Sequence, residues 1–201
     1  MAERLSLRRR FAYALGAAGF QITDRIVVAI AIFYYLPPGD SDLVPQVSGA
    51  TFLGVLTAFG AARLLGGLVD SLADPLVGWA SDRSRSRLGR RRVFLLAGIG
   101  PMVLAPALLF FPPGAPGSLL NFVWLTALLA VYYVFFTAYV GPYLALLPEI
   151  APDEQERVRL STLLAVAGVV IVGLYASGWL AGVEARQSWL GLDTVQSLQL
   201  V

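Results

Sequence analysis

The sequence predicts an all-α polytopic membrane protein with five transmembrane helices. Hydrophobic residues make up 57% of the chain and charged residues only 14%, which is far from the balance of a soluble domain. Five apolar stretches are long enough to cross a hydrocarbon core of about 30 Å, which takes about 20 helical residues. We expect the spans at residues 11–36, 50–80, 93–112, 119–147 and 160–183.

Proline and glycine mark the breaks between the expected spans. The first span ends at Pro37-Pro38-Gly39, the third at Pro112-Pro113-Gly114, and the fourth at Pro148 and Pro152. Ser161 and Thr162 are placed to cap the fifth helix. Residues 1–183 therefore form one helical bundle, and residues 184–201 are expected to be an external tail that contains the start of a sixth helix.

Arginine side chains are distributed unevenly between the loops. They gather at residues 4–10, 83–92 and 157–159, whereas the alternate loops carry no basic residue before Arg186. Positively charged loops stay on the cytoplasmic side, so the N-terminus is expected inside the cell and the protein in the plasma membrane. The formal charge of +2 comes from these topological arginines, so the lipid bilayer is an expected partner and nucleic acid is not.

The second span carries a stripe of charged and small residues. Arg63, Gly67, Asp70, Asp74 and Gly78 follow one another at steps of four, three, four and four, which places them on one face of a helix. Charged groups inside a membrane helix cost several kcal/mol unless they face protein, water or an ion. The stripe therefore indicates an internal site.

Two carboxylates one helical turn apart inside a membrane indicate a binding site for a cation or a proton. The pair Asp70 and Asp74 would repel unless a proton or a cation neutralises it, and a structural ion pair with Arg63 or Arg25 is the alternative. Pro75 leaves the Ser71 carbonyl without its helical donor, which makes Asp74 the stronger expected ligand. The sequence contains no Cys and no His, so we expect no metal other than sodium. An intramembrane aspartyl hydrolase would need its two aspartates on different helices, whereas Asp70 and Asp74 share one, so we expect neither an enzyme nor a cofactor.

The residues around this stripe resemble a known family. The runs 70–79, 81–83 and 87–92, together with residues 13–19, are similar to the glycoside-pentoside-hexuronide cation symporters of the major facilitator superfamily. The resemblance implies a cation site formed by Asp70, Asp74 and Thr137. It also implies a cytoplasmic gating motif formed by Gly78, Asp82, Arg83, Gly89 and Arg90.

The solute site departs from the family pattern. Gln21 stands where sugar-transporting relatives have an acidic residue, and Asp24 lies three residues later on nearly the same face. Gln21, Asp24, Arg25 and Tyr139 are therefore candidate solute-binding residues, although helix packing is the favoured explanation of the aromatic residues around Tyr139.

The number of spans suggests an incomplete transporter. The superfamily fold has two six-helix halves with the solute between them, and five spans are expected here, so we expect a further C-terminal half or a partner subunit. The resemblance implies sodium- or proton-coupled symport of a sugar or a related small solute. A non-transporting receptor or assembly subunit derived from the same fold is the alternative.

Overall fold

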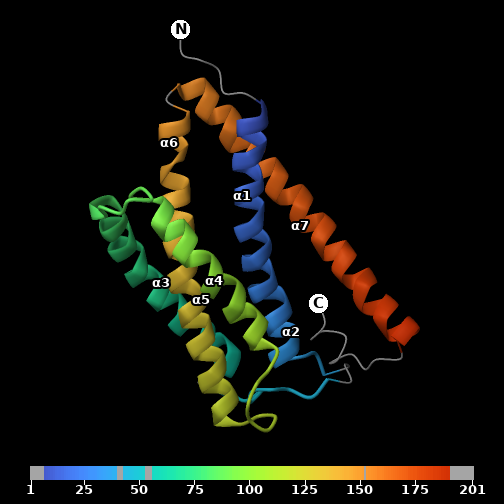
Figure 1. Cartoon of the computed structure of the whole chain (residues 1–201). Coiled ribbons are helices and arrows are strands. Elements are labelled where there is room, and N and C mark those ends of the chain that lie inside the picture. The colour runs from blue at the N-terminus through green and yellow to red at the C-terminus, as the bar shows by residue number, and fades with distance from the viewer. Residues whose placement is uncertain (1–6, 40–42, 53–55, 152, 191–201) are drawn as a thin grey trace.

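The computed structural model describes residues 7–39, 43–52, 56–151 and 153–190. This part of the chain is almost entirely helical. Its strands β1 (Thr51–Phe52) and β2 (Leu56–Thr57) form one short antiparallel hairpin. The helical elements are α1 (Leu7–Arg25), the π-helix η1 (Ile26–Ile30), α2 (Ala31–Tyr35), α3 (Ala58–Arg83), α4 (Arg92–Leu109), α5 (Leu119–Ala145), α6 (Leu147–Ile150) and α7 (Glu154–Leu190) (Figure 1).

In the part of the chain that the structure describes, four helical stretches are long and apolar enough to cross a membrane. They are Arg10–Tyr35, Arg92–Leu109, Leu119–Ile150 and Glu154–Leu174. Helix α3 is 26 residues long but carries the charged stripe, and this lowers its mean hydropathy. Because α3 packs along the apolar helix α5 (Figure 1), it lies in the same membrane layer as that helix. The chain is therefore an all-α multi-pass membrane protein.

The start of the second predicted span is wrong by eight residues. Helix α3 begins at Ala58 and not at residue 50, because the Thr57 hydroxyl accepts a hydrogen bond from the Gly60 amide at 3.1 Å. A threonine in this position satisfies one of the free amides of the first helical turn. The described residues Thr51–Phe52 and Leu56–Thr57 form the two strands of the hairpin instead.

The fifth helix also differs from its prediction at both ends. It begins at Glu154, where the Asp153 carboxylate accepts a hydrogen bond from the Glu156 amide at 3.1 Å. The predicted cap at Ser161 and Thr162 is therefore wrong: both residues lie inside α7. The helix continues to Leu190, so the first residues of the predicted tail are helical, and residues 191–201 lie outside the described part.

Two groups of helices make up the bundle. Helices α3 and α4 both pack against α5, whereas α1 packs against α7 (Figure 1). Tyrosine hydroxyls fasten the continuous helical stretch α1–η1–α2 to the first group at two points: Tyr13 of α1 donates to the Tyr143 carbonyl at 3.0 Å, and Tyr35 of α2 to the Leu109 carbonyl at 2.8 Å. The middle of the first helix, which contains Asp24, is held between these two anchor points.

The arginine-rich segments lie toward one end of the bundle. The start of α1, the α3–α4 loop and the α6–α7 turn are found toward this end in Figure 1. We predict that a cysteine introduced at Ser84 is protected in intact cells from an impermeant maleimide, while one at Ser48 reacts. The absence of native cysteine removes any background. The reverse pattern would contradict the cytoplasmic assignment of the N-terminus.

Candidate functional site

The centre of the candidate site is a contact between α3 and α5. The Thr137 hydroxyl donates a hydrogen bond to Oδ1 of Asp70 at 2.6 Å, the short length typical of a hydroxyl bound to a carboxylate. Thr137 is 4% exposed, and Asp70 is half-buried. The resemblance predicted Thr137 beside the aspartates, and the structure places its hydroxyl directly on one of them.

A glycine allows α3 and α5 to approach each other near this contact. A Cβ atom on Gly66 would lie 3.0 Å from the ring of Tyr133, so a larger residue there would push the two helices apart. The close approach brings the Tyr133 ring under the side chain of Arg63, whose guanidinium carbon is 4.6 Å from the ring centroid. A cation at this distance from an aromatic face is attracted by the ring.

A third helix adds a carboxylate to the same region. Asp24 of α1 lies close enough to Arg63, Arg25 and Asp70 to interact electrostatically with each of them. The hydroxyls of Tyr132 and Tyr133 lie in the same electrostatic neighbourhood, are buried, and have no hydrogen-bond partner among the described residues. Polar and charged groups from α1, α3 and α5 therefore converge on one place inside the bundle.

Asp74 is not part of this convergence. Its side chain is exposed on α3, and no hydrogen bond or ion pair joins it to another described residue. Ser71, whose carbonyl was expected to help bind a cation, is also exposed, and its hydroxyl donates to the Gly67 carbonyl at 2.9 Å. The structure thus brings together Asp70 and Thr137 of the predicted cation ligands and leaves Asp74 on the outer side of the helix.

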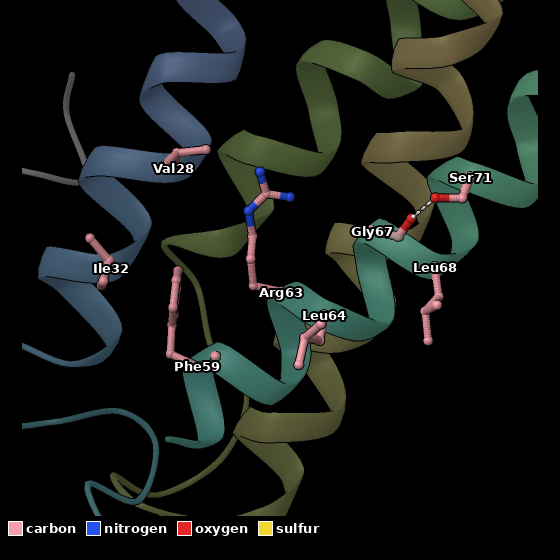
Figure 2. Close-up of a pocket in the computed structure, with 9 residues that line it drawn as sticks. Val28, Ile32, Phe59, Arg63, Leu64, Gly67, Leu68 and Ser71 are labelled. Atoms are coloured by element: carbon pink, nitrogen blue, oxygen red, sulfur yellow. Dashed lines mark hydrogen bonds between the residues drawn. The ribbon is translucent and has the colours of Figure 1, made fainter. Parts of the chain in front are cut away.

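A pocket of about 670 Å³ opens between the first helix and α3 (Figure 2). Arg63 is the one charged side chain among the described residues that line it, and in Figure 2 its guanidinium extends toward Val28. The other walls are mainly aliphatic and aromatic. The lining residues are Val28, Ile32, Phe59, Gly60, Arg63, Leu64, Gly67, Leu68 and Ser71.

None of the four candidate solute residues, Gln21, Asp24, Arg25 and Tyr139, is among the residues that line this pocket. The Gln21 side chain packs so closely on α7 that a Cβ on Gly168 would overlap it. Tyr139 is stacked on Tyr143 with ring centroids 5.9 Å apart, and Arg25 is exposed at the end of α1. Gln21 and Tyr139 are therefore engaged in helix packing. Asp24 reaches the charged centre, and Arg25 acts on Asp24 from the exposed end of α1.

The predicted gating motif forms part of a network of ion pairs at the arginine-rich end. Arg90 and Arg91 both contact Glu149 of α6, at 3.0 and 2.7 Å, and Arg91 also lies 3.9 Å from Asp82. Gly89 has a φ of +98°, a left-handed conformation that favours glycine. Sequence reasoning missed Glu149, because nothing in the sequence marks a carboxylate 59 residues from its arginine.

Arg83 is the charged member of the predicted motif that takes no part in these ion pairs. Gly78 is exposed, and the Arg83 guanidinium lies over the Trp79 ring, 5.3 Å from its centroid. Asp82 is exposed as well, so its contact with Arg91 is open to solvent and easily exchanged.

Comparison with known proteins identifies the family. Residues 12–192 match the family described as MFS/sugar transport protein. The chain belongs to this family. It is a family of transporters and not of enzymes, and it accounts for the multi-pass helical architecture. No group of three His, Cys, Asp or Glu side chains able to hold a metal ion occurs among the described residues.

Several similar proteins are symporters by name. The chain is 29% identical to the putative glycoside/cation symporter YagG of Escherichia coli over 84% of its own length and 34% of that protein. It is 31% identical to the inner membrane symporter YicJ of E. coli, over 83% and 34%, and 30% identical to an uncharacterized symporter of Synechocystis, over 80% and 28%. The chain thus spans about a third of the length of these relatives.

Proposed function

We propose that the chain provides the cation-binding half of a secondary active transporter. In this proposal a sodium ion or a proton binds at Asp70 and drives the symport of a sugar or a related small solute across the plasma membrane. The observation that carries the proposal is the Thr137–Asp70 hydrogen bond of 2.6 Å at the meeting point of three membrane helices. A carboxylate in this setting is costly unless a cation uses it.

The surrounding groups fit a small cation better than a structural ion pair. No ion pair joins Asp70 to Arg63 within the described ranges, so the carboxylate keeps an oxygen for a ligand. The Thr137 hydroxyl has lone pairs in addition to its donated hydrogen. Hard oxygen donors of this kind suit sodium, and the same carboxylate accepts a proton equally well.

The solute is proposed to bind near the charged centre. Its binding site would be completed by polar groups outside the described residues. The pocket beside Arg63 is mostly apolar, and apolar walls cannot satisfy the hydroxyls of a sugar. A second six-helix half, as in the superfamily fold, or a partner subunit would supply the missing polar groups. The name of the relative YagG mentions a glycoside and a cation, and we extend both to this chain as a proposal.

The ion pairs of Glu149 are proposed to act as the cytoplasmic gate. Breaking and remaking the exposed contact between Asp82 and Arg91 costs little, so the α3–α4 loop can exchange partners between two access states. The better-shielded contact between Arg91 and Glu149, at 2.7 Å, would keep the loop attached to α6 in one of these states.

Uptake into membrane vesicles tests the proposal. Vesicles from host cells that encode the chain at its own locus are given labelled mono- and disaccharides under an inward sodium gradient, an inward proton gradient, or neither. We expect at least one sugar to accumulate only under one of the gradients, and deletion of the locus should remove that accumulation. Identical uptake with and without the locus under every gradient would contradict the proposal.

A further inference from the structure

The pocket between the first helix and α3 has no role in the proposed cation site. Neither Asp70 nor Thr137 lines it. Its walls are aliphatic and aromatic apart from Arg63 and Ser71, and the Ser71 hydroxyl already donates to a backbone carbonyl of its own helix at 2.9 Å. Among the described lining residues, Arg63 is therefore the side chain with hydrogen-bond donors to offer a ligand.

The guanidinium of Arg63 carries donors that no described residue fills. An arginine side chain has five N–H donors and stays charged in proteins. Within the described ranges no hydrogen bond and no ion pair engages Arg63, and its guanidinium carbon lies over the Tyr133 ring, 4.6 Å from the centroid. An aromatic face attracts the charge but supplies no oxygen acceptor, and unsatisfied donors away from water are costly. The side chain therefore favours a ligand that brings an acceptor.

The nearby carboxylates do not take up these donors. Asp24 interacts through space with both Arg63 and Arg25, and no ion pair joins it to either arginine in the described part of the chain. Asp70 accepts a hydrogen bond from Thr137 instead, and neither carboxylate lines the pocket. An acceptor that enters the pocket therefore reaches Arg63 without displacing a bound side chain.

We propose that this pocket binds an organic monocarboxylate with an extended apolar body. The two oxygens of a carboxylate match the fork of a guanidinium, and one negative charge balances one positive charge. A phosphate monoester carries about −1.5 to −2 charges, more than one arginine neutralises. The hydroxyls of a sugar would find no partners on apolar walls. The pocket thus takes a ligand of a different class from the proposed sugar, and its assignment does not depend on coupled transport.

The shape of the pocket leaves room for the apolar body beside Arg63. Ser71, the last lining residue of α3, comes eight residues after Arg63, which is about 12 Å along a helix. Between them Gly67 has no side chain, and a Cβ atom there would meet nothing within 4 Å. Val28 and Ile32 of the first helix form the opposite wall (Figure 2). A straight chain whose carboxylate lies on Arg63 can therefore run past Gly67 between apolar walls and lose its contact with water.

A matched series of small amphiphiles tests the ligand class on the wild-type chain. The purified chain is placed in phosphatidylcholine nanodiscs at pH 7 in choline buffer without sodium, and binding of radiolabelled octanoate is measured against empty nanodiscs. Octanol, octyltrimethylammonium and acetate serve as competitors. Unlabelled octanoate should compete at least tenfold better than each of them, because octanol and the ammonium lack the negative charge and acetate lacks the apolar body.

Two variants change the charge and the space of the pocket separately. Arg63→Gln removes the positive charge, and Gly67→Leu keeps Arg63 but fills the room beside it. Each should weaken octanoate binding at least tenfold. Gly141→Leu is the matched control, because Gly141 is exposed on α5 and a Cβ atom there also meets nothing within 4 Å. This variant should bind octanoate as the wild type does.

Several results would overturn the inference. Equal competition by octanol and octanoate would show that the pocket does not select a carboxylate, and this comparison needs no substitution. Octanoate binding that survives either Arg63→Gln or Gly67→Leu would place the ligand elsewhere, as would an equal loss in Gly141→Leu. Because sodium is absent throughout, none of these results depends on the proposed cation site, which the uptake experiment tests separately.

Discussion

Asp70→Asn should abolish gradient-driven solute accumulation while leaving the chain inserted in the membrane. The amide preserves the shape of the side chain and can still accept from Thr137, but it carries no charge to hold a cation. Because coupling requires the cation to be bound, we expect accumulation in vesicles to fall to the level without a gradient. Uptake over time, with membrane content measured on the same vesicles, is the appropriate assay.

Asp74→Asn and a pair of substitutions at Thr137 are the matched controls. The Asp74 side chain is exposed and has no described partner, so its loss should weaken accumulation much less than the loss of Asp70. Thr137→Val removes a hydrogen bond to a charged group, worth about 1.5–3 kcal/mol, and should raise the half-saturating cation concentration at least tenfold. Thr137→Ser keeps the hydroxyl and should keep the half-saturating cation concentration near the wild-type value. A larger loss of accumulation in Asp74→Asn than in Asp70→Asn would contradict the assignment of the cation site to Asp70.

Glu156→Gln should destabilise the chain more than any substitution of an exposed charge. Nη2 of Arg10 lies 2.7 Å from Oε1 of Glu156, whose side chain is only 10% exposed. Breaking a buried pair by removing one partner costs about 3–5 kcal/mol, because the remaining charge is left uncompensated. Arg10 retains partial solvent contact, so we expect about 2–3 kcal/mol, measured as a lower midpoint of thermal unfolding in detergent.

The position of this ion pair explains why its loss should matter for the whole bundle. The pair joins α1 to the first turns of α7, beside a cluster that contains Tyr13, Tyr143 and Leu160. Glu154→Gln is the control, because Glu154 is exposed in the same helical turn. Equal unfolding midpoints for the two variants would show that the pair contributes nothing measurable, as is usual for exposed ion pairs.

Local sequence patterns were sufficient to predict the positions of the long helices and part of the candidate site. Apolar length located every long helix, and the spacing of Asp70 within the stripe predicted an internal charge on α3. The same spacing suggested that Asp74 would share the site. Four residues correspond to slightly more than one helical turn, and this rotation leaves Asp74 on a side of α3 that the other described residues leave exposed.

Contacts between distant segments could not be predicted from one sequence. The stacking of Arg63 on Tyr133 requires two helices to approach at Gly66, and the pairing of Arg91 with Glu149 depends on where α6 lies. The start of α7 was missed because Asp153 caps it before the apolar run begins, so hydropathy alone placed the boundary too late. Each of these features depends on tertiary geometry or on a polar cap.

The central claim is that Asp70 and Thr137 hold the coupling cation, and calorimetry of the purified chain tests it most directly. Sodium chloride is titrated into the wild type, Asp70→Asn and Thr137→Val in choline buffer. The account predicts saturable sodium binding in the wild type, weaker binding in Thr137→Val and no binding in Asp70→Asn. Equal sodium binding by the wild type and Asp70→Asn would contradict it.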